Sequence, residues 1–328
     1  IPADLCSIRD PLKSFKRGRS IEITKGLIHN YRNREYIDQC IGMCKILPRV
    51  EESYDLAIAY SAPVSLALYY VAYNIKANKK WTWIHNEVDQ ITVDIRDAKN
   101  VFKEYNKVFC VSKLAKEKFD LKLPEYKNKS EVFYNIMDFK LMEEKSKEKI
   151  EKSFDAKQYN ILTVGRICEE KGQDIIPAIA LKLKEKEINY KWYLIGEGEF
   201  EEKLRKEIKR LQIENYIILL GKKLNPYPYF RNCNLYVQTS RQEGYGLTLT
   251  EAKYFLKPII SSNTAGAMEQ IVNESNGIIT EFGVDQFVEQ IISLYHDSEK
   301  CKCIEKQLQK ERIKLIENKK IEEKLKEI

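Results

Sequence analysis

The sequence of 328 residues has few histidines, prolines and glycines, and no strong charge of either sign. It contains three histidines and eight cysteines without a CxxC pair, which argues against a zinc site. Nine prolines, 13 glycines and 43% hydrophobic residues exclude a collagen-like or largely disordered chain. The net charge of +7 permits an anionic ligand or a membrane surface but does not require nucleic acid. A globular protein with room for two domains is expected at this length.

Neither a leader nor a membrane anchor is expected. The chain starts at Ile1 without a basic and apolar leader, so we predict no signal peptide. Residues 56–75 lack charge over 20 positions, the length of a spanning helix, but polar residues interrupt them. A strand, a turn at Ser61 to Pro63 and a helix ending in IKANKK fit this stretch better. Cys110 and similar cysteines fall in apolar runs, which indicates a reducing cytoplasm.

Short apolar runs rich in β-formers alternate with helical patterns in both halves of the chain. Strands separated by helix-length segments are typical of βα units and parallel sheets, here in two successive copies. The predicted strands are 56–60, 80–85, 107–112 and 131–135 in the first copy, and 160–165, 192–196, 216–221, 234–240 and 258–262 in the second.

The charge pattern divides the chain into three parts. Residues 138–160 are dense in charge and poor in large apolar side chains, so we interpret them as a solvated connection. The predicted domains are 1–140, 141–297 and a helical tail at 298–328. In that tail, mixed charge accompanies helically spaced apolar residues, which favours packing on the protein over lying on a membrane. The first domain opens without a strand and ligand-binding loop, so we expect its first strands to be missing.

In open α/β sheets, ligands bind beyond the carboxyl ends of the strands. The loop GRICEEKG follows the strand at 160–165 and places Arg166 and Lys171 beside a helix start near Gly172. A guanidinium and an ammonium at one strand end suit a diphosphate. Two solvated surface cations are the alternative.

The next loop, GEGEFE, begins with Gly196 and Gly198. It matches the first half of GxGxxG, but Glu201 takes the place of the third glycine, so a dinucleotide fingerprint is unconvincing. The glycines let the backbone approach a ligand, or they form a plain turn.

The stretch EGYGLTLTE places Glu243 and Glu251 at either end of a turn that contains Gly244 and Gly246 and runs into a helix. The free amides of Tyr245 to Thr248 would hold a phosphate or a sugar hydroxyl. Ionised carboxylates accept hydrogen bonds only, so the two glutamates suit hydroxyl groups on either side of the phosphates. Each glutamate taken alone also fits an exposed surface acid.

His85 ends the strong strand at 80–85 and could donate to an oxyanion or a sugar hydroxyl. A structural histidine fits this position equally well. His29 and His296 lie in polar helical contexts without a partner motif, and we interpret them as surface residues.

Together these segments resemble family 4 of the retaining glycosyltransferases, which have the GT-B fold of two facing Rossmann-like α/β domains with parallel sheets. GRICEEKGQD is similar to the family's diphosphate clamp, and EGYGLTLTE to its paired-glutamate motif. LIGEGEFEEKL, GKKLNPYPYFRNCNLYVQTSRQEG and YNIMD further resemble bacterial enzymes that build surface polysaccharides. The similarity covers about 54 to 289, and the family's N-terminal glycine-rich loop has no counterpart before it.

The resemblance implies a metal-independent enzyme without a cofactor, and the sequence contains no DxD motif. It would move a hexose or N-acetylhexosamine, with retention, from a nucleotide-sugar, expected to be a UDP-sugar, to a glycan or lipid-linked acceptor. The pathway would be capsular polysaccharide, exopolysaccharide or lipopolysaccharide synthesis in the cytoplasm, at the inner face of the membrane. Implied catalytic residues are Glu243, His85, Arg166 and Lys171. Implied donor-binding residues are Gly165, Arg166, Lys171, Gly196, Gly198, Glu243, Gly244, Tyr245, Gly246, Leu247 and Glu251.

Within the resemblance, Arg166 and Lys171 would hold the diphosphate, Glu251 the ribose and Glu243 the donor sugar, with His85 near the transferring sugar. One alternative is an inactive nucleotide-sugar-binding subunit of a glycosyltransferase complex. A phosphorylase shares the fold but requires a lysine for pyridoxal phosphate, which nothing in the sequence singles out. A nucleic-acid-binding protein is the weakest candidate, because no recognition motif is present.

Overall fold

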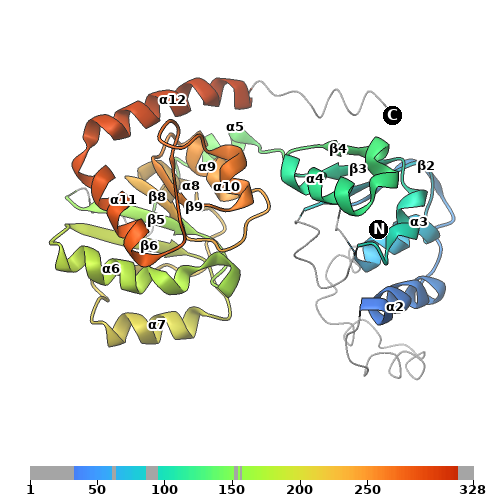
Figure 1. Ribbon diagram of the computed structural model, residues 1–328, viewed down its shortest axis with the longest axis horizontal. Coiled ribbons are helices and arrows are strands. Elements are labelled where there is room, and N and C mark those ends of the chain that lie inside the picture. Colours follow the sequence, from blue (N-terminus) through green and yellow to red (C-terminus); the bar gives the residue numbers. More distant parts are fainter. Residues whose placement is uncertain (1–32, 61–63, 86–94, 151–153, 156, 317–328) are drawn as a thin grey trace.

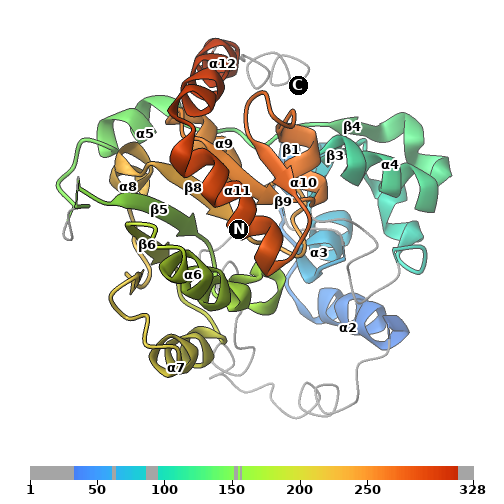
Figure 2. The same cartoon turned by 60° about the vertical axis from the view of Figure 1, so that its left-hand side comes forward.

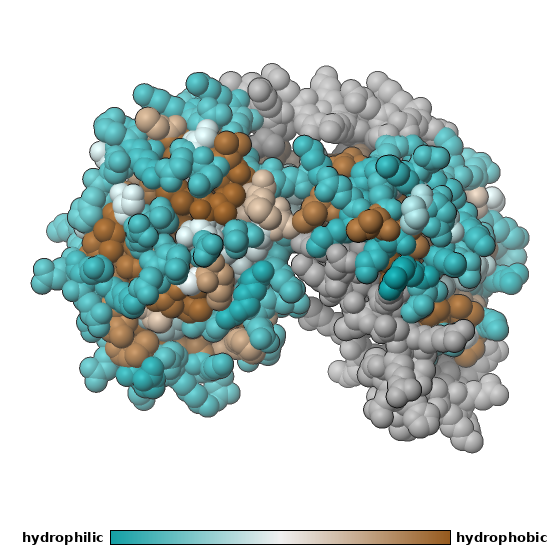
Figure 3. Space-filling view, in the orientation of Figure 1, coloured by the Kyte–Doolittle hydropathy of each residue, from teal (hydrophilic) through white to brown (hydrophobic). Residues whose placement is uncertain are grey.

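The computed structural model describes residues 33–60, 64–85, 95–150, 154–155 and 157–316, which form two parallel β-sheets in separate lobes (Figure 1). We name the described residues from α2 (Asn33–Ile46) through position 138 the first unit, and those from β5 (Tyr159–Val164) through α12 (Ser298–Ile316) the second unit. In the space-filling view, hydrophilic side chains cover most of the visible face of both lobes (Figure 3).

The first unit is a four-stranded sheet with helices. Its strands pair in chain order and are all parallel. They are β1 (Ser53–Ala59), β2 (Lys76–Ile84), β3 (Lys107–Cys110) and β4 (Ser130–Val132). The helical segments are α2 (Asn33–Ile46), α3 (Leu66–Asn74), η2 (Lys99–Glu104), α4 (Lys113–Lys122) and η3 (Pro124–Lys129).

The uncharged stretch at 56–75 divides into β1 and α3, and the predicted turn at 61–63 lies outside the described residues. The side chain of Ser65 begins α3 by accepting a hydrogen bond from the Leu68 amide at 3.2 Å. The expectation that IKANKK ends this helix was wrong, because Lys76 already pairs with Ser53 of β1. In the described part of the chain, no helix combines the length and hydrophobicity needed to span a bilayer.

Both faces of the first sheet are apolar. Leu68, Phe102 and Phe119 are fully buried where α3, η2 and α4 cover one face. The other face carries a separate aromatic cluster, in which the ring centroids of Trp83 and Phe109 are 4.5 Å apart. The sheet therefore positions rigid side chains up to the carboxyl ends of its strands, where His85 follows β2.

The second unit is a six-stranded parallel sheet in the order β10-β9-β8-β5-β6-β7. The chain runs outward from β5 to β7 and then returns to the other side of β5, so the strand order reverses between β5 and β8. Crevices at such a switch point are where open α/β sheets bind ligands. The strands are β5 (Tyr159–Val164), β6 (Tyr190–Ile195), β7 (Ile217–Leu219), β8 (Leu235–Gln238), β9 (Ile259–Ser262) and β10 (Ile278–Thr280).

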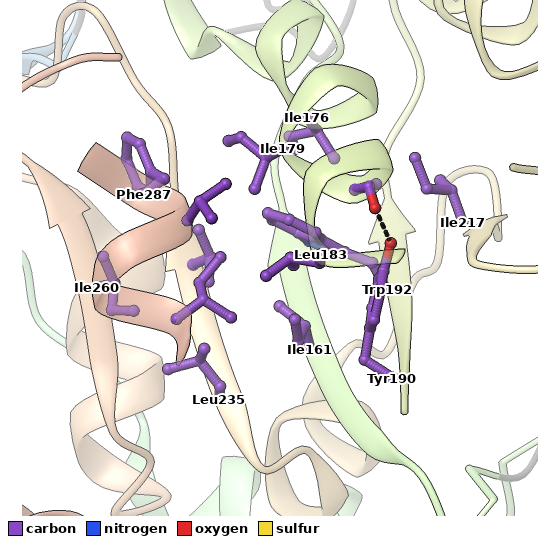
Figure 4. Close-up of a cluster of buried hydrophobic side chains, with 14 of the residues drawn as sticks. Ile161, Ile176, Ile179, Leu183, Tyr190, Trp192, Ile217, Leu235, Ile260 and Phe287 are labelled. Atoms are coloured by element: carbon purple, nitrogen blue, oxygen red, sulfur yellow. Dashed lines mark hydrogen bonds between the residues drawn. The ribbon is translucent and has the colours of Figure 1, made fainter. Parts of the chain in front are cut away.

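Helices cover both faces of this sheet, and α6 and α11 lie in front of its strands in Figure 2. Figure 4 shows Leu183 of α6 beside Trp192 of β6, and Phe287 of α11 at the other side of the same cluster, on the side of Ile260. Tyr229 of α8 and Leu249 of α9 pack on the opposite face. The segments are η4 (Glu169–Lys171), η5 (Gln173–Ile175), α6 (Ile176–Glu185), α7 (Glu201–Arg210), α8 (Tyr227–Asn232), α9 (Leu247–Tyr254), α10 (Ala265–Gln270) and α11 (Val284–His296).

The segment predicted as a solvated connection is in part a packed helix. Asp138 begins α5 (Phe139–Lys145) by accepting a hydrogen bond from the Leu141 amide at 2.9 Å. The ring of Phe139 stacks on Tyr254 of α9 with centroids 4.9 Å apart. Met142 is buried in the cluster under α8 and α9 of the second unit. Apolar side chains thus pack a segment whose composition is dominated by charge onto the second unit, and the pair between Arg231 and Glu143 at 2.8 Å adds a polar contact.

The last described helix, α12 (Ser298–Ile316), packs on the second unit. Ile304 and Leu308 of this helix are buried in the core of the second unit. The guanidinium of Arg312 lies 4.4 Å from the ring centroid of Tyr254. The sequence left two alternatives for this helix, packing on the protein or lying on a membrane, and in the structure it packs on the protein. Each of the nine predicted strand runs overlaps a strand, whereas β10 was not predicted.

Candidate functional site

A cleft of about 320 Å³ opens at the carboxyl ends of β5 and β8, at the switch point of the second sheet. Most of its lining comes from the loops of the second unit, and three side chains come from the first unit. The lining residues are His85, Val111 and Asn135 from the first unit, and Thr163, Val164, Gly165, Lys171, Gln173, Gln238, Thr239, Ser240, Glu243, Gly244, Tyr245, Gly246, Leu247 and Thr248 from the second. The predicted residues among them are His85, Gly165, Lys171, Glu243, Gly244, Tyr245, Gly246 and Leu247.

The stretch EGYGLTLTE forms the wall of this cleft. Gly246 precedes the first residue of α9 and has a φ of +84°, a left-handed conformation that favours glycine. It turns the chain into α9, whose first residues Leu247 and Thr248 line the cleft, and the dipole at a helix start favours negative charge. The binding of an anion at this wall stays a prediction.

Lys171 and Glu243 contact each other across the cleft. The Nζ of Lys171 donates to Oε2 of Glu243 at 2.6 Å, and both side chains are mostly buried. The amide Nε2 of Gln238 lies 3.5 Å from the same carboxylate oxygen, while its Oε1 accepts from the Thr248 hydroxyl at 2.8 Å. Sequence reasoning placed the cation and the acid in the same region but did not anticipate that they pair.

Arg166 does not line the cleft. Its guanidinium pairs with Glu170 at 3.0 Å, and both side chains are more than half exposed, at 63% and 59%. Exposed ion pairs of this kind contribute about 0–1 kcal/mol, so turning Arg166 away from Glu170 costs little. The structure places Arg166 next to Gly165, one residue from the lining.

Glu251 lies one turn into α9 and also does not line the cleft. No hydrogen bond joins its carboxyl group to another residue in the described ranges. Burial alone raises the pKa of this carboxyl to about 7. Glu251 is partly buried, and an acid withdrawn from water without a donor is costly to keep ionised, so the position suits a ligand that brings hydroxyl donors.

His85 reaches the cleft from the end of β2. Its Nε2 is buried and has no hydrogen-bond partner among the described residues. A hydrogen bond to the Tyr60 backbone involves the other ring nitrogen and favours the protonated ring, but burial dominates and lowers the pKa of His85. In the neutral ring, the Nδ1 proton then faces Tyr60, and Nε2 is free to accept a hydrogen bond from a ligand.

Gly196 and Gly198 are needed for backbone packing, and neither lines the cleft. A Cβ atom on Gly196 would lie 1.8 Å from the Gly165 carbonyl oxygen, and one on Gly198 would lie 2.1 Å from that of Ile167. The loop after β6 thus packs directly against the loop after β5. The sequence left two interpretations of these glycines, close approach of the backbone to a ligand or a plain turn. In the structure, the backbone does approach another group closely, but that group is a neighbouring loop.

Polar residues that sequence reasoning missed fill the rest of the lining. Gln238, Thr239 and Ser240 end β8, and Gln173 follows Lys171. Asn135 lies within the YNIMD stretch of the first unit. Their position after a strand was a usable signal, but uncharged side chains at strand ends are common and did not stand out.

His296 ends α11, away from the cleft residues, and His29 lies outside the described residues. The cysteines of the described ranges are free thiols, and most of them are buried. Neither observation points to further chemistry at the cleft.

The Glycosyl transferases group 1 family profile matches residues 144–311, just over half of the chain. The chain belongs to this family. The match covers the second unit with its three loops, and the α/β architecture with two parallel sheets is the GT-B fold.

Relatives of this chain include several proteins named for polysaccharide synthesis. An N-acetylgalactosaminyltransferase of Campylobacter jejuni, which acts on a diphospho-undecaprenol-linked sugar by its name, is 26% identical over 70% of this chain and 65% of its own length. The capsular polysaccharide biosynthesis glycosyltransferase CapM of Staphylococcus aureus is 30% identical over 48% of this chain and 42% of its own length. The chain therefore spans less than two thirds of either relative.

Solved structures of glycosyltransferases share the fold. Anabaena HepE in complex with UDP and glucose superposes with a TM-score of 0.70 at 19% identity, covering 89% of this chain and 81% of that one. A glycosyltransferase from Rickettsia africae gives a TM-score of 0.65 at 18% identity, covering 88% and 78% of the two chains. Both resemblances support the same two-unit architecture.

Proposed function

We propose that this glycosyltransferase transfers a hexose or N-acetylhexosamine from a UDP-sugar to a glycan or lipid-linked acceptor with retention of configuration. The observation that carries the proposal is the cleft at the switch point. It combines a lysine, the start of α9 and an unpartnered histidine nitrogen in one lining, with a buried unpaired acid one turn into the same helix. A nucleotide sugar offers a group to each of them.

Several comparisons support the donor and the pathway. HepE was solved with UDP and glucose, and the names of the Campylobacter and Staphylococcus relatives refer to lipid-linked and capsular glycans. We propose that this chain acts likewise in bacterial surface-polysaccharide synthesis, in the cytoplasm and at the inner face of the membrane. Membership of retaining family 4, without a metal, is part of the same proposal.

The binding step follows from the Lys171–Glu243 pair. A diphosphate in the cleft would compete with Glu243 for the Lys171 ammonium, because phosphate oxygens accept strong charge-assisted hydrogen bonds. Glu243, released from Lys171, would then accept hydrogen bonds from hydroxyls of the donor sugar. Arg166, turned from Glu170, would add a second cation, and Glu251 would accept from the ribose hydroxyls.

The transfer step needs the bond between the sugar and the diphosphate to break. Negative charge then develops on the leaving diphosphate, where Lys171, Arg166 and the first amides of α9 stabilise it. The sugar becomes oxocarbenium-like, and Nε2 of His85 lies on the facing wall to accept from, or after protonation donate to, a sugar hydroxyl. The acceptor hydroxyl forms its bond to the anomeric carbon from the face that the diphosphate leaves, which retains the configuration. Its proton passes to the departing phosphate oxygen, so the glycoside and UDP are the products.

Calorimetry with UDP and a UDP-release assay with a panel of UDP-sugars test the proposal. Lys171→Ala should weaken UDP binding by about tenfold to a hundredfold, because a charge-assisted contact is lost. Glu243→Ala should not weaken UDP binding, and should strengthen it where Glu243 competes with the diphosphate for Lys171. It should reduce turnover by orders of magnitude, since the contact to the donor sugar is lost. Lys206→Ala, a change at an exposed lysine of α7, is the matched control.

The alternative function is an inactive nucleotide-sugar-binding subunit. UDP binding without turnover of any UDP-sugar in the panel would favour it over the enzyme. Absence of UDP binding in the wild-type chain, or binding that is indifferent to Lys171→Ala, would refute the assignment of the cleft to the donor.

A further inference from the structure

The short helix α10 lies between the Glu243–Leu247 wall and the first unit. Its Gly266 amide donates to the Glu243 carbonyl at 2.9 Å, and the Gln270 side chain donates to the Gly246 carbonyl at 3.1 Å. A Cβ atom on Gly266 would lie 2.4 Å from the Tyr245 carbonyl oxygen, so the helix packs directly on the wall. One side of α10 is thus fixed to the backbone of the proposed donor site.

The other side of α10 presents Glu269 to the first unit. Both carboxylate oxygens accept from the Lys113 amide at 2.9 Å, and Oε1 also accepts from the Tyr134 hydroxyl at 2.7 Å. Lys113 is the first residue of α4, where a negative charge is favourable beside the helix dipole. Three hydrogen-bond contacts therefore connect one side chain of the second unit to two segments of the first.

A ring contact accompanies these hydrogen bonds. Tyr134 lies against Tyr245 of the cleft wall, with ring centroids 5.2 Å apart. Burial, followed by the hydrogen bond to Glu269, raises the pKa of Tyr134, so its hydroxyl remains a donor at neutral pH. Asn135, the next residue, lines the cleft from the first unit.

We propose that Glu269 is a positioning residue that holds the first unit, with His85 and Asn135, at the separation from the Glu243–Leu247 wall that transfer requires. The catalytic consequence rests on the proposed function. Donor groups of the second unit can bind the nucleotide alone, whereas transfer needs both walls. Misplacement by about 1 Å can reduce a rate by about a hundredfold, so a contact that sets this separation affects turnover without touching substrate.

Three variants separate positioning from general stability. Glu269→Ala removes all three hydrogen bonds, Glu269→Gln keeps one acceptor oxygen and loses the charge, and Tyr134→Phe removes one hydroxyl and keeps the ring. Glu289→Ala, at an exposed residue of α11, is the matched control. For each full-length variant we would measure UDP affinity by calorimetry, UDP release from UDP-glucose and UDP-N-acetylglucosamine, and the radius of gyration by solution scattering.

Glu269→Ala should lower turnover by about tenfold or more and leave UDP affinity within about twofold of the wild type. Its radius of gyration should increase, Glu269→Gln and Tyr134→Phe should fall between it and the wild type, and Glu289→Ala should match the wild type. Wild-type turnover and an unchanged scattering profile in Glu269→Ala would overturn the inference. So would a parallel loss of UDP affinity, which would mean that the donor wall itself had been damaged.

A failure of the proposed function gives a different result. If the wild-type chain binds no UDP, the assignment of the cleft falls, and the scattering profiles alone decide the role of Glu269. Expansion of Glu269→Ala relative to Glu289→Ala then supports the contact between the units, and identical profiles refute it.

Discussion

Replacing Glu251 by glutamine should stabilise the free protein at high pH. Burial raises the pKa of this carboxyl from an ordinary value of 4.5 to about 7, and no described residue donates a hydrogen bond to it. The carboxylate is therefore ionised at neutral and alkaline pH in a place that disfavours its charge. Glutamine has nearly the same shape and remains uncharged, so it resembles the protonated acid.

The sign follows from the two pKa values. Folded Glu251 binds its proton more tightly than the unfolded chain does, so its contribution to stability is present below about 4.5 and is lost as the pH rises to about 7. One pKa unit corresponds to about 1.4 kcal/mol, which makes the loss roughly 3 kcal/mol at pH 8. We expect Glu251→Gln to raise the free energy of unfolding by roughly 2–3 kcal/mol at pH 8 and hardly at all at pH 4.5.

Urea unfolding of the wild type, Glu251→Gln and the exposed-site control Glu289→Gln at pH 4.5, 6 and 8 measures this difference. The gain of Glu251→Gln should grow with pH, while the effect of Glu289→Gln should stay small throughout. An equal effect of Glu251→Gln at pH 4.5 and 8, or a loss at pH 8, would refute the reasoning that burial holds this acid unpaired.

Ligand binding extends the same prediction to the proposed function. Ribose hydroxyls that donate to the ionised Glu251 would lower its pKa, so UDP binding near pH 6.5 should release protons and strengthen as the pH rises. Calorimetry in buffers with different ionisation enthalpies detects this release. The terminal phosphate of UDP also titrates near pH 6, at about the same pH, so Glu251→Gln should reduce the release by the share of Glu251. Release of the same size in the variant would assign all of the protons to other groups.

Four further substitutions test the fold and the facing wall. Gly196→Ala should lower the free energy of unfolding by at least about 3 kcal/mol, because its Cβ would lie 1.8 Å from a backbone oxygen. Gly42→Ala, with no atom within 4 Å of the new Cβ in α2, should instead raise it by about 0.5–1 kcal/mol in the same denaturation assay. His85→Phe should reduce UDP-sugar turnover by at least about tenfold and leave UDP affinity unchanged, since His85 belongs to the first unit. Trp192→Phe should cost roughly 1–2 kcal/mol in urea, because the indole donates to the buried Thr163 hydroxyl at 3.0 Å; an unchanged midpoint would contradict this.

Local patterns were enough to predict most of the strands. Runs such as residues 160–165 and 234–240 are apolar, rich in β-formers and bounded by loop residues, so each signals a strand without reference to its partners. The pattern failed where pairing overrides composition. The polar residues of KANKK form β2 because β1 lies beside them, and no property of the segment itself indicates this.

The sequence was enough to predict that these loops lie at the carboxyl end of the sheet, but not which of their side chains contact each other. Lys171 and Glu243 are 72 positions apart, and their contact depends on the order of β5 and β8 in space. The backbone role of Gly196 likewise depends on a neighbouring loop. Glu269 gave no signal at all, because a single glutamate in a short helix is indistinguishable from a solvated one until α4 is placed opposite.

The distribution of the tryptophans gives the chain an intrinsic optical probe of each unit. Trp81 and Trp83 lie in the aromatic cluster of the first unit, and Trp192 lies in the core of the second, all almost fully buried. Their emission should shift to longer wavelength as each core becomes exposed to water. A variant without Trp192 would report melting of the first unit alone, and one that keeps only Trp192 would report the second, so the order in which the units unfold can be read by fluorescence without any attached dye.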